Sequence, residues 1–164
     1  MKRTHVFLLA AGVVLSGTVV GNAQIRQGTQ EIGFSGSYTH GTKDNDDSRF
    51  WNVSGVYGYF VTDQLEILGI GQLQGQKGES TQGQIGAGAD WHFFMQGNPN
   101  FIPFVGASYL FGVSDTPDAL DLHVGLKQFV TRNVAIKYQV GYGFDPSDTG
   151  DANFGASVGL SFFF

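Results

Sequence analysis

The chain has 164 residues, the size of one domain. It contains no cysteine, which excludes disulfides and thiolate metal sites, and its acidic residues outnumber its basic residues by 14 to 9, which argues against a nucleic-acid partner. Charged residues make up only 14% of the chain, against about 25% in typical domains. So low a charge content is unusual for a surface that faces water.

Residues 1–23 have the features of a secretory signal peptide. They combine a basic start at Lys2 and Arg3, an uncharged apolar run over 6–20 and small residues just before Gln24. The run is shorter than the about 20 residues of a transmembrane helix, and no later stretch is long and apolar enough for one. We therefore predict export and removal of this segment. Its loss takes two of the 9 basic residues and no acidic one, so the net charge of −5 becomes −7.

The remaining residues, 24–164, alternate between apolar and polar side chains in a way that predicts a single all-β domain. We expect eight strands, over 31–40, 49–61, 65–74, 81–94, 101–111, 120–127, 134–144 and 154–164. The third strand is the least regular, because Leu68 and Ile70 fall on its polar side. The last strand is the most regular, and pairing it with the first would close the sheet into a barrel.

The connections between these strands alternate in kind. Those near 62–64, 95–100 and 131–133 are short, whereas the others carry many acidic residues: Asp44, Asp46, Asp47, Glu79, Asp115, Asp118, Asp145, Asp148 and Asp151. Outer-membrane barrels have this asymmetry, with short periplasmic turns and longer external loops. Four phenylalanines mark the rim of the barrel at the short turns. Each is separated from the previous one by one hairpin and one connection: Phe60, Phe94, Phe129 and Phe164.

Alternation alone does not decide which face of a barrel points outward. Aromatic residues lie near the strand ends of the apolar face and are predicted to form two girdles: Trp51, Tyr57, Tyr59, Trp91, Phe93, Tyr109 and Tyr142. Two girdles suit the two interfaces of a bilayer. The polar face is built from Gly, Ser and Gln, which suits a narrow filled interior better than a soluble surface. These features favour a transmembrane barrel.

Several short motifs accompany this pattern. They are Pro-Phe-Val-Gly-Ala at 103–107, Phe-Val-Thr at 60–62 and at 129–131, and the terminal phenylalanine. Together with the signal peptide and the eight strands, they resemble the small bacterial outer-membrane proteins of the OmpA-like and OmpX-like type. The resemblance covers 24–164 and implies an antiparallel up-and-down barrel without the peptidoglycan-binding domain of full OmpA-type proteins. It also implies an assembly signal read by the barrel-assembly machinery, at Leu160, Phe162 and Phe164.

Charged residues on the polar face are expected to meet inside the barrel as a polar network: Glu66, Asp90, His92, Asp121, His123, Lys127 and Lys137. Isolated charges there would be costly, so we expect ion pairs. A gated pore or a proton-linked site is one interpretation of such a network. A structural polar plug is the favoured one, because an eight-stranded barrel is just wide enough for its own side chains.

Nothing in the sequence indicates catalysis. Barrel-forming lipid A deacylases use a His-x-Ser arrangement, but Phe93-Phe94 follow His92 and Val124-Gly125 follow His123, so no nucleophile–base pair is visible. The acidic loops around Asp44 and Asp145 lack EF-hand spacing, and no metal or cofactor is assigned. Divalent cations could still bridge these loops to lipopolysaccharide phosphates.

We therefore predict a monomeric, non-enzymatic barrel in a bacterial outer membrane, with periplasmic termini and a structural or surface-interaction role. Its predicted partners are outer-membrane lipids, lipopolysaccharide and the barrel-assembly machinery, and not nucleic acid. One alternative is a small channel for small polar or hydrophobic solutes. The apolar residues Leu68 and Ile70 on the polar side are the observation that supports this alternative. A second alternative is a soluble exported barrel that binds a lipophile.

Overall fold

A computed structural model describes residues 25–40, 49–76, 81–95, 98–113, 116–144 and 152–164. The predicted signal peptide lies outside these residues, as do all the acidic loop residues named above except Asp118. Among the described residues, no helix is long and apolar enough to span a bilayer.

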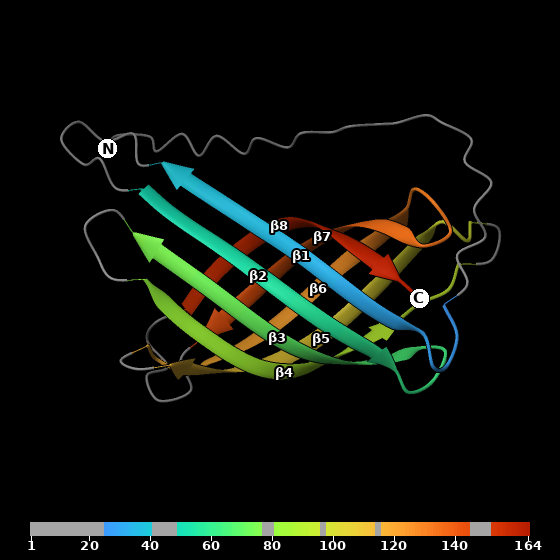
Figure 1. Cartoon of the computed structure of the whole chain (residues 1–164), viewed down its shortest axis with the longest axis horizontal. Coiled ribbons are helices and arrows are strands. Elements are labelled where there is room, and N and C mark those ends of the chain that lie inside the picture. The colour runs from blue at the N-terminus through green and yellow to red at the C-terminus, as the bar shows by residue number, and fades with distance from the viewer. Residues whose placement is uncertain (1–24, 41–48, 77–80, 96–97, 114–115, 145–151) are drawn as a thin grey trace, which may run out of the picture.

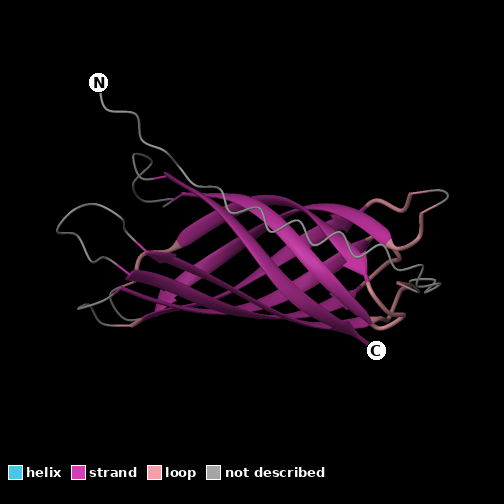
Figure 2. Cartoon of the chain, turned by 90° about the horizontal axis from the view of Figure 1, so that it is seen from above, coloured by secondary structure: helices cyan, strands magenta, loops and turns pink. Residues whose placement is uncertain are grey.

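Eight antiparallel strands form one closed barrel, as predicted (Figure 1). They are β1 (Gln30–His40), β2 (Arg49–Phe60), β3 (Leu65–Gln76), β4 (Gln82–His92), β5 (Phe101–Val113), β6 (Ala119–Phe129), β7 (Val134–Phe144) and β8 (Ala152–Phe163). Each strand pairs with its neighbour in sequence, and β8 pairs with β1 to close the sheet. All strands are inclined to the long axis of the barrel (Figure 2).

Every strand presents a row of apolar residues outward, as the alternation predicts for a transmembrane barrel. Phe34 is 58% exposed, and the outward residues of other strands, such as Ile85, Leu122 and Val158, are exposed to a similar degree. The residues between them in sequence point inward and include most of the buried polar side chains. Leu68 and Ile70 also face inward, and Leu68 is buried there.

The Phe-Val-Thr repeat marks two turns of the same construction. After β2, the amide of Val61 donates to the carbonyl of Leu65 over 2.9 Å, and after β6 the amide of Val130 donates to the carbonyl of Val134 over 2.9 Å. In each turn a threonine hydroxyl accepts further backbone amides; Leu65, for example, donates to Thr62 Oγ1 over 2.9 Å. Two distant segments with one sequence pattern therefore have one local structure.

The short-turn end of the barrel is closed by an apolar cluster. Its members are buried and come from the inward faces of five strands and from the segment before β1: Ile25, Phe60, Ile102, Phe129, Ala135 and Phe163. The residues before β1 cross this end, where the amide of Gly28 donates to the carbonyl of Phe60 over 2.8 Å. Gly28 has a φ of 89°, a conformation that favours glycine. Of the four spaced phenylalanines, Phe60 and Phe129 belong to this cluster, whereas Phe94 and Phe164 are exposed on the outside.

Candidate functional site

A chain of charged side chains fills the barrel interior directly above the apolar cluster. All seven residues predicted for the polar network point inward, and the structure brings them into two bonded groups. Lys127, Glu66 and His92 form one, and Asp90, Asp121, His123 and Lys137 form the other. The ring of Phe104 lies between the two groups. Each of the seven residues comes from the polar face of β3, β4, β6 or β7, because the side-chain period of a strand is two. The network is therefore a direct product of the strand pattern.

Lys127 is the centre of the first group. Its side chain is 0% exposed, and its ammonium donates to Glu31 Oε2 and, over 2.8 Å, to Glu66 Oε2. The ammonium also lies 5.5 Å from the ring centres of Phe60 and Phe163 and 5.6 Å from that of Phe104. Two carboxylates and three aromatic faces thus surround one buried cation, which compensates its loss of hydration.

His123 joins two aspartates higher in the barrel. Its Nδ1 lies 2.6 Å from Asp121 Oδ1, and its Nε2 lies 2.7 Å from Asp90 Oδ1. The ring therefore bridges the two aspartates through both of its nitrogens, and each contact is within hydrogen-bond distance. Asp90 also receives a cation, because Lys137 Nζ lies 3.5 Å from its Oδ2.

Three inward-facing glycines leave room for these side chains. A Cβ on Gly58 would overlap the carboxylate of Glu66, and a Cβ on Gly106 would overlap Asp90. A Cβ on Gly125 would likewise overlap the ring of Phe104. Glycine at these positions lets a large neighbour lie flat against the barrel wall.

Glu66 and His92 hold the one mismatch in the network. Glu66 Oε1 and His92 Nε2 are buried without a hydrogen-bond partner among the described residues, and His92 Nε2 lies 3.5 Å from Glu66 Oε2. His92 Nδ1 faces the carbonyl of Gln64 at 3.3 Å. Ligand atoms of Glu66, Asp90 and His92 lie within 4.8 Å of one another, a spacing that suits a metal ion. Lys127 already neutralises Glu66, so we assign no metal to these residues.

A cavity of about 690 Å³ lies above the network, toward the loop end of the barrel. Its floor includes Asp121, His123 and Lys137, and its walls are mostly small or amide side chains. Glutamines pair across two strands there: Gln74 Nε2 donates to Gln82 Oε1 over 3.2 Å. The interior is therefore filled at one end and hollow at the other.

The outer surface carries the predicted aromatic residues. Tyr57, Tyr59, Trp91, Phe93 and Tyr142 are exposed, whereas Trp51 and Tyr109 are half-buried. The hydroxyl of Tyr109 donates to Asp118 Oδ2 over 2.8 Å, which ties this outward ring to the loop after β5.

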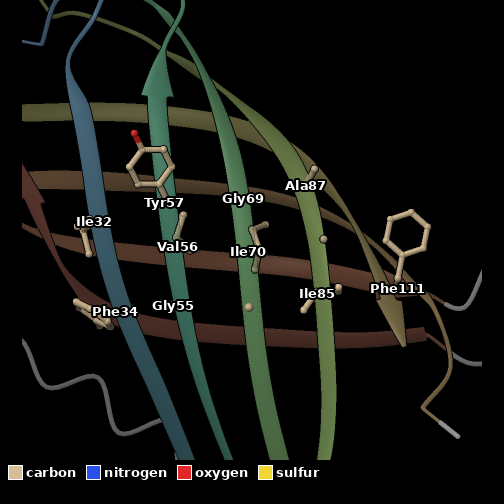
Figure 3. Close-up of a pocket in the computed structure, with 12 residues that line it drawn as sticks. Ile32, Phe34, Gly55, Val56, Tyr57, Gly69, Ile70, Ile85, Ala87 and Phe111 are labelled. Atoms are coloured by element: carbon tan, nitrogen blue, oxygen red, sulfur yellow. The ribbon is translucent and has the colours of Figure 1, made fainter. Parts of the chain in front are cut away.

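A second hollow, of about 700 Å³, lies over β1 to β5 and is lined mostly by outward residues, with the inward-facing residues Val56, Ile70 and Gly86 also in its lining. Gly55, Gly69 and Gly71 leave its floor low, and Figure 3 shows Phe34 and Phe111 at its two sides. The lining is almost entirely apolar; Tyr57 is its one polar side chain, and the hydroxyl of Tyr57 donates to Gln30 Oε1 over 2.9 Å.

The sequence pattern missed three members of the network. Glu31 and Ser161 are 1% exposed and bonded to each other, with Ser161 Oγ donating to Glu31 Oε1 over 2.7 Å, and Phe104 lies between Lys127 and Lys137. The alternation did contain the signal for Glu31, because Ile32 and Phe34 share the outward face of β1 and the residues that alternate with them, including Glu31, face inward. Its partner Lys127 lies 96 residues away, which no local pattern indicates.

Comparison with known proteins supports the architecture. The N-terminal β-barrel domain of Pseudomonas aeruginosa OprF aligns with 86% of this chain and all of its own, with a TM-score of 0.61 and 19% identity. Neisserial surface protein A aligns with 83% of this chain and 96% of its own, with a TM-score of 0.54 and 15% identity. A de novo designed transmembrane β-barrel aligns with 87% of this chain and 99% of its own, with a TM-score of 0.53 and 16% identity. No protein-family profile and no curated sequence matches the chain. At these identities the likeness establishes the fold, that of the small eight-stranded outer-membrane barrels.

Proposed function

We propose that this chain is an integral protein of a bacterial outer membrane with a structural or surface-interaction role and no catalytic activity. One observation carries the proposal: the barrel is apolar outside and polar inside. Large apolar side chains such as Phe111, Val124 and Leu160 are about half exposed around the whole barrel, while charged groups are buried within it. A soluble barrel would have the reverse distribution. The same observation disfavours the soluble lipophile-binding alternative.

The proposed orientation places both described ends of the chain in the periplasm. Ile25 and Phe164 lie at the short-turn end, next to the turns after β2 and β6. Short turns face the periplasm in outer-membrane barrels. The loop end, which carries Asp118, would then face outward and meet lipopolysaccharide or another surface partner.

Outward residues of β8 are the proposed contact with the barrel-assembly machinery. Leu160, Phe162 and Phe164 are all exposed along the outside of this strand. We expect Phe164→Ala to lower the yield of inserted barrel in cells without changing the refolded barrel in micelles. Normal insertion of this variant would remove the role proposed for Phe164.

A barrel that does not conduct is the state that the interior favours. The apolar cluster and the Lys127 network fill the cross-section at the short-turn end, where Phe60, Ile102 and Lys127 are fully buried. The hollow loop end supports a channel as the second candidate, because a rearrangement of the network would connect it with the periplasm.

Two measurements test these proposals separately. Mobility that shifts on heating in gels, together with extraction only by detergent, is expected for a membrane barrel; a fully soluble periplasmic protein would contradict membrane insertion. Single-barrel conductance in planar bilayers is expected to stay at background. Conductance well above background would reject the filled interior and favour the channel.

A further inference from the structure

The seam between β1 and β8 is closed over only part of its length. The register pairs Glu31–Gly36 of β1 with Val158–Phe163 of β8. Both strands continue toward the loop end, where β1 pairs with β2 as far as His40 and β8 pairs with β7 as far as Ala152. Between residues 37–40 and 154–157, all of which the structure describes, no β1–β8 pairing is present. Every other seam is paired along nearly its whole length.

The interior cavity reaches the outer surface at this open part of the seam. Its lining includes inward residues of β8 such as Ser157, but also the outward residues Phe154 and Ala156 of the same strand. Phe154 is 75% exposed. Alternate residues of a strand point to opposite faces. Here the mixed lining coincides with the part of β8 that is not paired with β1, so we infer that the cavity passes around this strand edge. A Cβ on Gly155 would meet nothing within 4 Å, which agrees with open space there.

The opening lies at the depth of the loop-end aromatic girdle. Phe154 pairs with Tyr142 on β7, and Tyr142 is an exposed outward ring. The unpaired stretch extends from this level for about 13 Å along β8, at about 3.3 Å per residue. If the barrel spans the membrane, the opening therefore joins the headgroup region to the upper hydrocarbon of the outer leaflet.

We propose that this opening is a lateral binding site for a single-chain amphiphile with an uncharged, hydroxyl-bearing headgroup. The proposal rests on the membrane location proposed above. The acyl chain lies outside, against Phe34, Phe154 and Leu160, and the headgroup enters the cavity beside Ser157. Unpaired backbone groups along the two strand edges supply donors and acceptors for the hydroxyls, and such groups are costly at this depth when left without partners.

Charge distribution in the cavity disfavours an anionic headgroup, and the serine and glutamine side chains of the lining favour a neutral one. Lys137 faces Asp90, and His123 lies between two aspartates, so the basic groups of the floor already have anionic partners. An anionic headgroup would meet Asp121 and Glu31 without a free cation to balance it. A neutral headgroup meets serine and glutamine side chains and exchanges hydrogen bonds with them.

The experiment uses a monoacylglycerol with a diazirine in its acyl chain and the refolded barrel in phospholipid nanodiscs. Photolabelling is expected to concentrate on peptides of β1 and β8, several-fold above those of β4 and β5. Gly155→Trp, which fills the opening, should remove this enrichment. Gly71→Trp is the matched control, because Gly71 points outward and a Cβ there also meets nothing within 4 Å.

A second pair of variants covers the case in which Gly155→Trp does not fold. Ser37→Cys with Ser157→Cys, joined by a bismaleimide, closes the open seam, and the chain has no cysteine of its own to interfere. Gln139→Cys with Ser157→Cys joins strands that are already paired at the same depth. The first crosslink should abolish the enriched labelling and the second should leave it unchanged.

Labelling spread evenly around the barrel, or unaffected by closing the seam, would overturn the proposal. Competition by a fatty acid as strong as by unlabelled monoacylglycerol would overturn the assigned headgroup. Heat-modifiable mobility is measured on every sample, so a barrel that never enters the membrane is recognised as a failure of the proposed location and not of the lateral site.

Discussion

The two halves of the barrel interior are built on the same alternating strands and yet differ in density. In the half near the short turns, Lys127, Glu66 and Phe60 are fully buried and in mutual contact. In the half near the loops, a cavity of about 690 Å³ remains, lined by glycine, serine and glutamine. Side-chain size on the inward face, and not the fold, decides whether an eight-stranded barrel is filled or hollow.

The difference also separates two ways of satisfying polar groups. In the filled half, the Lys127 ammonium pairs directly with two carboxylates and with aromatic rings, so its stability depends on specific partners. In the hollow half, amide side chains such as Gln74 and Gln82 pair across adjacent strands beside open space, where water can replace a lost partner. Mutations should therefore cost far more in the first half than in the second.

The largest loss is expected for Lys127→Met. It leaves Glu31 and Glu66 buried without their cation, a change that costs about 3–5 kcal/mol for buried ion pairs. Urea unfolding in micelles, followed by tryptophan fluorescence, measures the free energy of unfolding. Lys137→Met is the control and should cost clearly less, because Lys137 is partly exposed and 3.5 Å from Asp90. Equal losses for the two variants would contradict the central role of Lys127.

Phe60→Ala should cost nearly as much, about 3–5 kcal/mol, because it leaves a cavity in the apolar cluster at the short-turn end. The same unfolding measurement applies. Phe111→Ala removes the same ring from the outer surface, where it is 54% exposed, and should change the free energy of unfolding little. A small effect of Phe60→Ala would mean that this end is not densely filled.

Gly58→Ala should have an intermediate effect. The added methyl group overlaps the carboxylate of Glu66, and overpacking of this kind costs about 1–3 kcal/mol. Gly71→Ala is the matched control, since its methyl group meets nothing within 4 Å. If both variants unfold at the same urea concentration, Glu66 is free to move away from the wall.

The smallest effect is expected in the hollow half. Gln84→Ala removes a hydrogen bond of 2.9 Å from Nε2 to the carbonyl of Pro117, which is worth about 0.5–1.5 kcal/mol. Gln72→Ala, whose bond to Gln84 is 3.5 Å long, should cost less still. A loss as large as that of Lys127→Met would show that the two halves do not differ as proposed.

The number of strands, the closure of the sheet into a barrel and the residues that point inward or outward could all be predicted from the sequence, because the alternation has one period throughout. It even placed Leu68 and Ile70 inside, although both are apolar. It also placed the seven charged residues on the inward face. Which of these charges form ion pairs could not be predicted from the sequence. The partner of an inward charge depends on the register between neighbouring strands, which adds up around the barrel. The bond between Lys127 and Glu31, across β6 and β1, is the clearest case.

The open part of the β1–β8 seam was equally invisible in the sequence. Both strands alternate regularly there, and regular alternation predicts a strand without saying what it pairs with. How far the seam is paired depends on the backbone register between β1 and β8, and this register is a property of the whole closed sheet. Local patterns thus determined the faces of the strands, whereas the contacts between distant strands required the structure.

The Lys127 network has a consequence for the order in which the barrel forms. Neighbouring hairpins can form from local contacts, but this network joins β1, β3, β6 and β8, and one of its bonds links residues 130 positions apart. A partly assembled sheet in the bilayer would present Lys127 and its carboxylates to hydrocarbon without each other. Closure of the barrel should therefore be the step after which the chain proceeds to the folded state. Intermediates with only some strands inserted should be sparsely populated. A slow, single-phase folding reaction is the kinetic signature expected of such distant contacts.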